Sequence, residues 1–305
     1  MTNAASALNL LETDIVIGST VVLTGPNGGK YPYGNSIVVI GAEETLLIDP
    51  SLGLIDRDPL KVDRMLVSHA HEDHLAGVHL HPQASVHAHT EDVGAVRSFD
   101  LFLEVYGMPS SIADQWGPQI IDEFHYVPRL DATSFEDGAR FDLGGGISVE
   151  VVHLPGHTRG HCGFMIEPDG VFFVADVDLS AFGPYYGDHW SDLEDFERSI
   201  AKARTIQAKH YATFHHKGVV AGQDEFVRQL DAFGAVIAKR EVALLEFLAE
   251  PATMSDIVAH RFIYRPGVDL LFADHVERTS MTMHLTRLQR TGAVLEIEPG
   301  RFRTV

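Results

Sequence analysis

The chain has 305 residues, an apolar fraction of 45% and a formal net charge of −20, and this length allows a large buried core and more than one domain. The excess of acidic residues disfavours non-specific contact with nucleic acid or anionic lipid, and no apolar run approaches the length of a bilayer-spanning helix. A single cysteine, Cys162, rules out an internal disulfide, and the first residues show no basic segment followed by an apolar stretch, so we expect a cytoplasmic protein without membrane contact.

Several β-strands are predicted in the first part of the chain, because short runs rich in β-branched residues alternate with Gly, Pro and Asn. These runs fall at 15–17, 20–24, 36–40 and 45–48. A further buried strand is expected to end at 64–67, directly before the most informative segment of the sequence.

Residues 68 to 74 read Ser-His-Ala-His-Glu-Asp-His and place three histidines and one aspartate within six positions. Imidazole nitrogens and carboxylates are ligands of a borderline divalent metal such as zinc. His69 and His71, two positions apart on an extended segment, point the same way, and Asp73 and His74 on the following turn can face a second position. One segment could therefore supply two adjacent metals. The alternative is a histidine-rich surface turn, because the chain contains 18 histidines.

Further donors occur singly or in pairs at predicted turns and strand ends. His157 follows a Pro-Gly pair that favours a turn after a β-rich run. Asp176 ends an apolar run, and an unpaired carboxylate at the tip of a buried strand should meet a cation. His215 and His216 end another short strand before a Lys-Gly pair. For either of these two histidines, the alternative is a hydrogen-bonded side chain under a loop.

The loop after Asp176, residues 178–190, holds several aromatic side chains together with Gly and Pro. It could line a substrate pocket. The alternative is a loop whose aromatic side chains only pack it against the rest of the protein. The apolar spacing of residues 193–208 then predicts an outer helix.

The last part of the chain is predicted to be a separate domain, so we divide the sequence into 1–222 and 223–305. Its predicted elements are three helices and a two-stranded hairpin, at 226–248, 253–262, 277–290, 293–297 and 301–305. Three helices and a two-stranded wing resemble a winged-helix module.

Winged-helix modules often bind DNA, and this one contains the basic residues Arg287, Arg290, Arg301 and Arg303. Residues 223–305 nevertheless contain 12 acidic and 10 basic residues, so the module carries a charge of −2. This balance favours packing or homodimerisation over nucleic-acid binding.

Taken together, the motifs resemble the metallo-β-lactamase superfamily, with a metal motif similar to that of glyoxalase II. The resemblance rests on His69-x-His71-x-Asp73-His74, a Gly-His turn, an aspartate at a strand end and a late histidine, at intervals of about 85, 20 and 40 residues. It covers about the first 220 residues and implies an α/β fold, the αββα sandwich, in which all ligands cluster at one sheet edge. In this family an insertion such as 99–128 often forms a wall of the pocket. The alternative is a helical segment on the protein surface.

The resemblance implies a ligand set for two metal ions that consists of histidines and aspartates. One ion would be held by His69, His71 and His157, the other by Asp73, His74 and a late histidine, with Asp176 bridging both. The last family motif usually has one histidine before a glycine. With Lys217-Gly218 as the anchor we favour His216, and His215 is the alternative. Zinc is the expected metal, although manganese or iron suits the same donors.

A hydroxide held between two such ions would attack an ester, thioester, lactone or similar small acyl substrate. Asp73 could accept or return a proton while also serving as a ligand. A metal-dependent phosphodiesterase or endoribonuclease is one alternative, since some relatives with an appended winged helix act on RNA. A mononuclear iron oxygenase of the same fold, using only the His69/His71 site, is another, and a non-enzymatic binding protein is a third.

Overall fold

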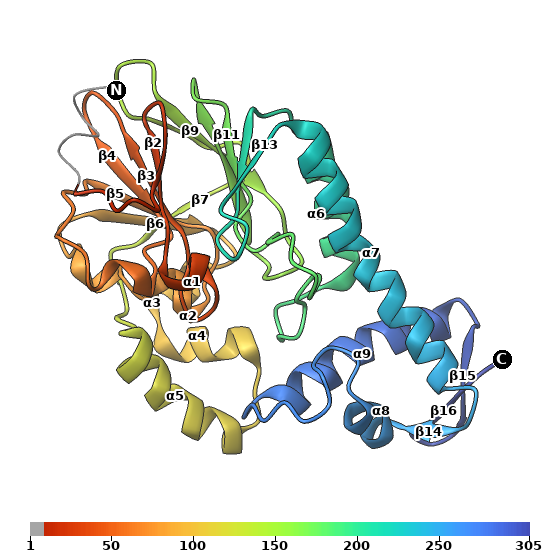
Figure 1. Cartoon of the computed structure of the whole chain (residues 1–305). Helices are drawn as coiled ribbons and strands as arrows, with labels where there is room; N and C mark the ends of the chain where they lie inside the picture. Colours follow the sequence, from red (N-terminus) through yellow and green to blue (C-terminus); the bar gives the residue numbers. More distant parts are fainter. Residues whose placement is uncertain (1–8) are drawn as a thin grey trace.

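The computed structural model describes residues 9–305. Two β-sheets lie face to face in the centre, helices cover the outer face of each sheet, and a smaller helical module with its own sheet extends from one end (Figure 1). This is the αββα sandwich expected from the sequence.

The first sheet contains seven strands in the order of the chain. The strands at its start pair antiparallel, and from β4 onward the pairing is parallel. Their bounds are β1 (Ile15–Ile17), β2 (Thr20–Leu23), β3 (Ser36–Ile40), β4 (Thr45–Ile48), β5 (Arg64–Val67), β6 (Ser85–His89) and β7 (Thr133–Phe135). The strands predicted in this region are therefore present.

The second sheet contains six strands in the order β13-β12-β11-β10-β9-β8. All its pairs are antiparallel except β11 with β12, which run parallel. Their bounds are β8 (Arg140–Asp142), β9 (Ser148–His153), β10 (Cys162–Glu167), β11 (Val171–Phe173), β12 (His210–Ala212) and β13 (Val219–Ala221).

Alternating side chains of the first sheet enter two different apolar cores. Ile37 and Leu46 pack between the sheets with residues such as Phe164 of the second sheet. Their neighbours Val38 and Leu47 face the opposite side and pack under the helices. The period of two in an extended chain produces this division, and it explains why these strands are apolar throughout instead of alternating with polar residues.

Two groups of helices cover the outer faces of the two sheets. The first group is α2 (Glu72–Leu75), α3 (Val93–Arg97), α4 (Phe99–Tyr106) and α5 (Ser110–Phe124), with the tight turn α1 (Pro26–Gly29) and the 3₁₀ turns η2 (Leu52–Leu54) and η3 (Val78–Leu80) in the connections. The second group is α6 (Leu193–Thr205) and α7 (Gln223–Phe247). Helices α4 and α5 form the insertion predicted at 99–128.

The C-terminal module contains three helices and a three-stranded antiparallel sheet of order β14-β16-β15. Apart from the end of α7, its elements are β14 (Ala252–Thr253), α8 (Met254–His260), α9 (Ala273–Arg290), β15 (Val294–Glu298) and β16 (Arg301–Thr304). The strand β14 was not predicted, since it is only two residues long and pairs with the distant β16. Helix α9 begins four residues before the predicted start at 277.

Helix α7 belongs to two apolar cores. Phe226, Leu230 and Phe233 in its first half pack against the second sheet and α6, whereas Leu244 in its last turns packs inside the C-terminal module. The module also returns to the sandwich through α9, where His275 Nε2 donates to the carbonyl of Tyr106 at 2.9 Å. The module therefore packs closely against the sandwich.

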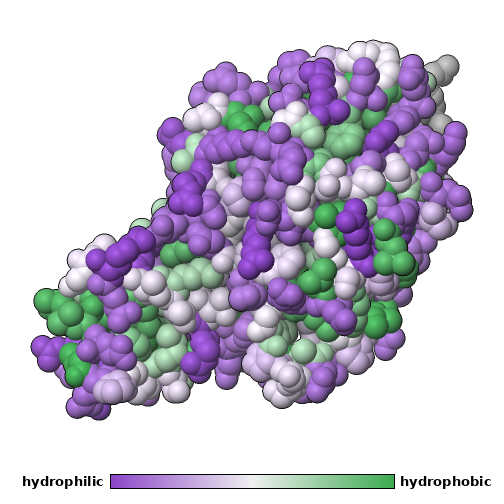
Figure 2. Space-filling model, turned by 180° about the vertical axis from the view of Figure 1, so that it is seen from behind, coloured by the Kyte–Doolittle hydropathy of each residue, from purple (hydrophilic) through white to green (hydrophobic). Residues whose placement is uncertain are grey.

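Most of the surface visible from behind is hydrophilic, and apolar residues gather in small patches, including some on the end formed by the C-terminal module (Figure 2). This distribution agrees with the net charge of −20. Within residues 9–305, none of the helices combines the length and the apolar character that crossing a membrane requires.

Candidate metal centre

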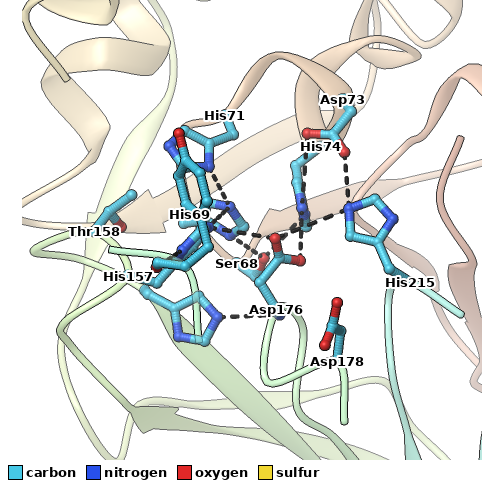
Figure 3. Close-up of polar contacts among 12 residues, drawn as sticks. Ser68, His69, His71, Asp73, His74, His157, Thr158, Asp176, Asp178 and His215 are labelled. Atoms are coloured by element: carbon cyan, nitrogen blue, oxygen red, sulfur yellow. Dashed lines mark hydrogen bonds and ion pairs between the residues drawn. The ribbon is translucent and has the colours of Figure 1, made fainter. Parts of the chain in front are cut away.

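The predicted donors His69, His71, Asp73, His74, His157 and Asp176 meet with His215 at one edge of the sandwich (Figure 3). Each donor segment follows the carboxyl end of a strand: β5 precedes residues 69–74, β9 precedes His157, β11 precedes Asp176, and β12 precedes His215. Four strands from two sheets thus deliver side chains that are far apart in the sequence to one place.

One group of donors consists of three buried histidines. His69 Nε2 lies 3.0 Å from His71 Nδ1 and 3.1 Å from His157 Nε2. Nitrogen ligands of a tetrahedral zinc ion, each 2.0–2.1 Å from the metal, lie about 3.3 Å apart. His157 Nδ1 donates to the carbonyl of Tyr185 at 2.9 Å, which leaves the Nε2 lone pair directed at the other two rings. The three nitrogens therefore have the spacing that one metal ion requires.

A second group consists of Asp73, His74 and His215. Asp73 Oδ2 lies 3.1 Å from His215 Nε2, and Asp73 Oδ1 lies 3.9 Å from His74 Nε2. His215 Nδ1 is hydrogen-bonded to the carbonyl of Gly29 at 2.8 Å, so its Nε2 is free to act as a ligand. This arrangement can hold a second ion.

Asp176 lies between the two groups. Its Oδ1 is 3.1 Å from His74 Nε2, and its Oδ2 is 3.3 Å from His157 Nε2. Within residues 9–305, Asp73 Oδ2, His74 Nε2 and Asp176 Oδ1 are buried without a hydrogen bond of acceptable geometry. Buried polar atoms are normally satisfied, so unsatisfied oxygens and nitrogens that face one another fit a site for cations.

Of the two adjacent histidines, the structure brings His215 into the cluster and turns His216 away. His216 Nε2 is 3.9 Å from Asp178 Oδ2, its side chain is 38% exposed, and it belongs to none of the donor groups found within residues 9–305. The sequence-based preference for His216 is therefore not supported by the geometry, and its stated alternative, His215, takes the position.

The electrostatics of the cluster depend on these close approaches. Burial alone would lower the pKa of His74, but the carboxylates of Asp176, Asp49 and Asp73 raise it well above the ordinary value. Burial also opposes protonation of His215, yet Asp176 and Asp73 raise its pKa to about 9. His69 differs, because burial and the neighbouring rings lower its pKa well below the usual range. Without a metal, protons on His74 and His215 offset the buried carboxylates, and bound cations would replace them.

Two aspartates that sequence reasoning missed hold the donor segments in place. Asp49 accepts hydrogen bonds from the backbone N–H and the hydroxyl of Ser68, each at 2.6 Å, and its Oδ2 lies 2.8 Å from His74 Nδ1. Asp188 Oδ2 lies 3.0 Å from His71 Nε2. Carboxylates commonly orient the histidine ligands of metals in this way. The only sequence signals were an aspartate at a strand end and one within the aromatic loop, which are too common to be diagnostic.

A third missed residue, Asp92, connects two ligand-bearing loops. Its Oδ2 accepts from the backbone N–H of Ala70 at 3.0 Å and from Thr158 Oγ1 at 2.7 Å. Its Oδ1 accepts from the N–H of Gly160 at 2.8 Å. A Cβ on residue 160 would lie 2.7 Å from the Asp92 Cγ, so a larger residue here would displace the Asp92 side chain. Asp92 therefore fixes the loop of His69 and His71 relative to the loop of His157.

A cavity of about 300 Å³ opens beside the donors. Besides the donors and the nearby Tyr31, Glu72 and His216, its wall has contributions from three longer parts of the chain. These are the insertion of α4 and α5, the loop after Asp176, and the segment between α8 and α9, which contribute Tyr106, Met108, Trp116, Asp178, Phe182, Tyr185, Asp188, Tyr264, Leu270 and Phe272. The sequence had indicated the first two as possible walls, but not the third.

Residues 32–222 match the metallo-beta-lactamase superfamily. Because this segment is more than half of the chain, the chain belongs to that superfamily. The family assignment based on the His-x-His-x-Asp-His motif is confirmed.

Two curated relatives illustrate the range of similar proteins. The atrochrysone carboxyl ACP thioesterase of Aspergillus fumigatus is 25% identical over 218 residues, which cover 67% of this chain and 57% of that protein. The hydroxyacylglutathione hydrolase of Ruegeria pomeroyi is 28% identical over 150 residues, which cover 47% of this chain and 46% of that protein. The matches thus span about half the length of these relatives.

Solved structures resemble the whole chain. A metallo-beta-lactamase family protein from Thermus thermophilus has a TM-score of 0.69 at 22% identity, and the match covers 94% of this chain and 99% of that one. A beta-lactamase domain protein from Burkholderia ambifaria has the same TM-score at 16% identity and covers 96% of this chain and 93% of that one. At these identities the similarity concerns the fold, and its coverage extends into the C-terminal module.

Proposed function

We propose that this chain is a metal-dependent hydrolase with two metal ions, acting on an ester, thioester, lactone or similar small acyl substrate. The main support is the position of Asp176, whose two carboxylate oxygens face different histidines, 3.1 Å from His74 and 3.3 Å from His157. Membership of the metallo-beta-lactamase superfamily and the similarity to a thioesterase and a hydroxyacylglutathione hydrolase also favour hydrolysis.

The ligand set that we propose contains the sequence-predicted residues with His215 in place of His216. His69, His71 and His157 would hold one ion, Asp73, His74 and His215 the other, and Asp176 both. When bound, two such cations lower the pKa of water and polarise a substrate carbonyl. Zinc suits these donors, and manganese or iron remain alternatives.

The chain's own residues then orient the reactants and handle protons. Asp73 lines the cavity; burial would raise its pKa, but His74 and His215 lower it. Its carboxylate is therefore ionised near neutral pH, as both a ligand and a proton acceptor must be. The aromatic side chains around the cavity lower the local polarity, which strengthens electrostatic interactions inside it.

The alternative of a phosphodiesterase or endoribonuclease is less well supported. Arg287 and Arg290 form ion pairs within the chain, Arg287 with Glu241 and Glu197 and Arg290 with Glu194. These arginines are therefore engaged and do not form a basic track toward the cavity. A mononuclear iron oxygenase is disfavoured because the second donor group is complete.

We also propose that residues 223–305 form a winged-helix-like module. The order helix, strand, helix, helix, strand, strand and the three-stranded antiparallel sheet support this. Leu295 and Ile297 on β15 are exposed and offer a surface for a homodimer. The single cysteine, which is buried and free, fits a cytoplasmic location.

The proposed function is tested by Asp176→Ala. Purified protein is analysed for metal content and assayed with a panel of esters, thioesters, lactones, phosphodiesters and RNA. We expect acyl hydrolysis by the unmodified chain and a loss of about 10³-fold or more in kcat/KM in a folded variant, as expected for a group that positions the reacting centre. Near-normal turnover in folded Asp176→Ala would exclude the two-metal mechanism, and activity confined to RNA would favour the alternative.

A further inference from the structure

The cavity lining combines two kinds of side chain. It includes the proposed ligands and three further acids, Glu72, Asp178 and Asp188. It also includes the apolar side chains of Met108, Trp116, Phe182, Leu270 and Phe272. A substrate bound at the metal centre would therefore meet apolar side chains within the same cavity.

Within residues 9–305, no lysine or arginine lines the cavity. The buried guanidinium of Arg240 lies behind the wall, where it donates to the carbonyls of Pro184 at 2.6 Å and Phe182 at 2.8 Å and lies over the Phe182 ring. These bonds direct its charge at the loop backbone. An anionic group on a substrate, away from the metal ions, would therefore find no lysine or arginine in the lining to pair with.

Glu72 occupies a fixed position in the lining. It follows His71 directly, is buried, and accepts hydrogen bonds from Tyr31 Oη at 2.9 Å and from the Tyr106 hydroxyl. Both tyrosines line the cavity as well. Their hydroxyl donors are thus directed at Glu72 and are engaged before a substrate enters.

We propose that the cavity selects an uncharged acyl compound with an apolar group, and that the segment between α8 and α9 is a specificity-determining wall. This proposal rests on the proposed hydrolase function for the acyl group. The selection itself follows from the apolar side chains of the lining and the lack of lysine and arginine among the lining residues. It gives the C-terminal module a role at the substrate site.

Binding of two non-hydrolysable thioethers tests the selection. S-octyl-N-acetylcysteamine is uncharged, whereas S-octylglutathione carries the same octyl group on an anionic peptide. Calorimetry with the metal-loaded protein should show binding of the uncharged compound at least about 10-fold tighter. Equal or tighter binding of the glutathione compound would overturn the proposal.

A matched pair of variants tests the wall. Leu270 lines the cavity and is 42% exposed, whereas the adjacent Leu271 is 38% exposed and is not part of the lining. Leu270→Arg should strengthen binding of S-octylglutathione about 10-fold by supplying the missing cation, and Leu271→Arg should leave it unchanged. The same response in both variants would overturn the assignment of the wall.

Turnover of the two corresponding octanoyl thioesters is measured separately. If binding shows the expected preference but neither thioester nor any other acyl compound is hydrolysed, the proposed function fails and the binding selectivity stands. If both are hydrolysed and the glutathione thioester has the higher kcat/KM, the function stands and the selectivity fails.

Discussion

At the scale of single residues, His215 and His216 show what a sequence pattern leaves open. Both are histidines before Lys217-Gly218, and only the backbone path separates them. His216 has a positive φ of 60°, and the carbonyl of His215 accepts from Thr213 Oγ1 at 2.6 Å and from the N–H of Lys217 at 2.8 Å. This tight turn directs the two rings differently. A left-handed conformation at a non-glycine residue is uncommon and is not evident from the Lys-Gly anchor, so the sequence could not separate the two histidines.

The two histidines give a matched pair of substitutions. His215→Ala should lose one metal equivalent and lower kcat/KM by about 100-fold or more, beyond the 10–100-fold typical of residues that only orient a ligand. His216→Ala should keep its metal content and most of its activity. Elemental analysis and steady-state kinetics on both proteins decide between them. Metal loss in His216→Ala with retention in His215→Ala would reverse the assignment.

A residue-scale pH effect is expected at His161. Burial lowers its pKa to about 3, helped by the nearby His157, against about 6.5 in an unfolded chain. Below pH 6.5 the unfolded chain gains this proton and the folded chain does not, so stability is lost as the pH falls from 6.5 toward 3. In metal-free protein, the free energy of unfolding therefore has a slope against pH in this range. His161→Gln should reduce that slope by about 1.4 kcal/mol per pH unit.

Denaturant titrations between pH 6 and 4 measure the two slopes. Because His69 also has a lowered pKa and is present in both proteins, only the difference between the slopes is informative. Identical slopes would show that His161 is not buried in its neutral form.

At the scale of elements, the strands were predictable and their partners were not. The β-branched runs at 15–48 formed strands because each one is a local pattern. The short β14 needs β16, 48 residues further along the chain, and no local pattern indicates such a pair. The donors His157 and Asp176 could be proposed because turns and strand ends have local signatures. Asp49, Asp92 and Asp188 act through contacts with distant segments, and the sequence did not distinguish them from other aspartates.

Asp92→Ala should destabilise the donor loops together. The substitution leaves the N–H groups of Ala70 and Gly160 and the hydroxyl of Thr158 without their acceptor. Each unsatisfied buried donor costs about 1–3 kcal/mol, so the loss in the free energy of unfolding should be about 3 kcal/mol or more. Urea denaturation measures it. Thr158→Val, which removes only one donor, is the control, with a loss of about 1 kcal/mol. An equal, small loss in both variants would contradict the connecting role of Asp92.

At the scale of the whole molecule, the C-terminal module was foreseen as a set of elements, but not as part of the cavity wall. Its docking depends on contacts between distant residues. The hydroxyl of Tyr186 lies 2.9 Å from His284 Nε2, and Ser280 Oγ donates to the carbonyl of Tyr186 at 3.4 Å. The predicted boundary at 222 falls just before α7, and the two halves of that helix pack in different cores.

Metal removal should weaken the entire fold. The carboxylates of Asp73 and Asp176 and the surrounding histidines are buried in one cluster, and an ion that binds only the folded state stabilises it. At a free concentration about 1,000-fold above its Kd, the gain is about 4 kcal/mol. The free energy of unfolding, measured by denaturation, should be several kcal/mol higher in protein supplied with zinc, manganese or iron than in protein treated with a chelator. Identical curves would mean that the cluster binds none of these ions.

The division of the donors between the two sheets also determines when the centre can be completed. His69, His71, Asp73 and His74 follow a strand of the first sheet, whereas His157, Asp176 and His215 follow strands of the second. A nascent chain that has emerged only as far as residue 150 holds four of the seven donors and no bridging carboxylate. Capture of both proposed ions would therefore wait until residue 215 has left the ribosome and the sheets have docked, which would place metal loading late in the biosynthesis of this protein.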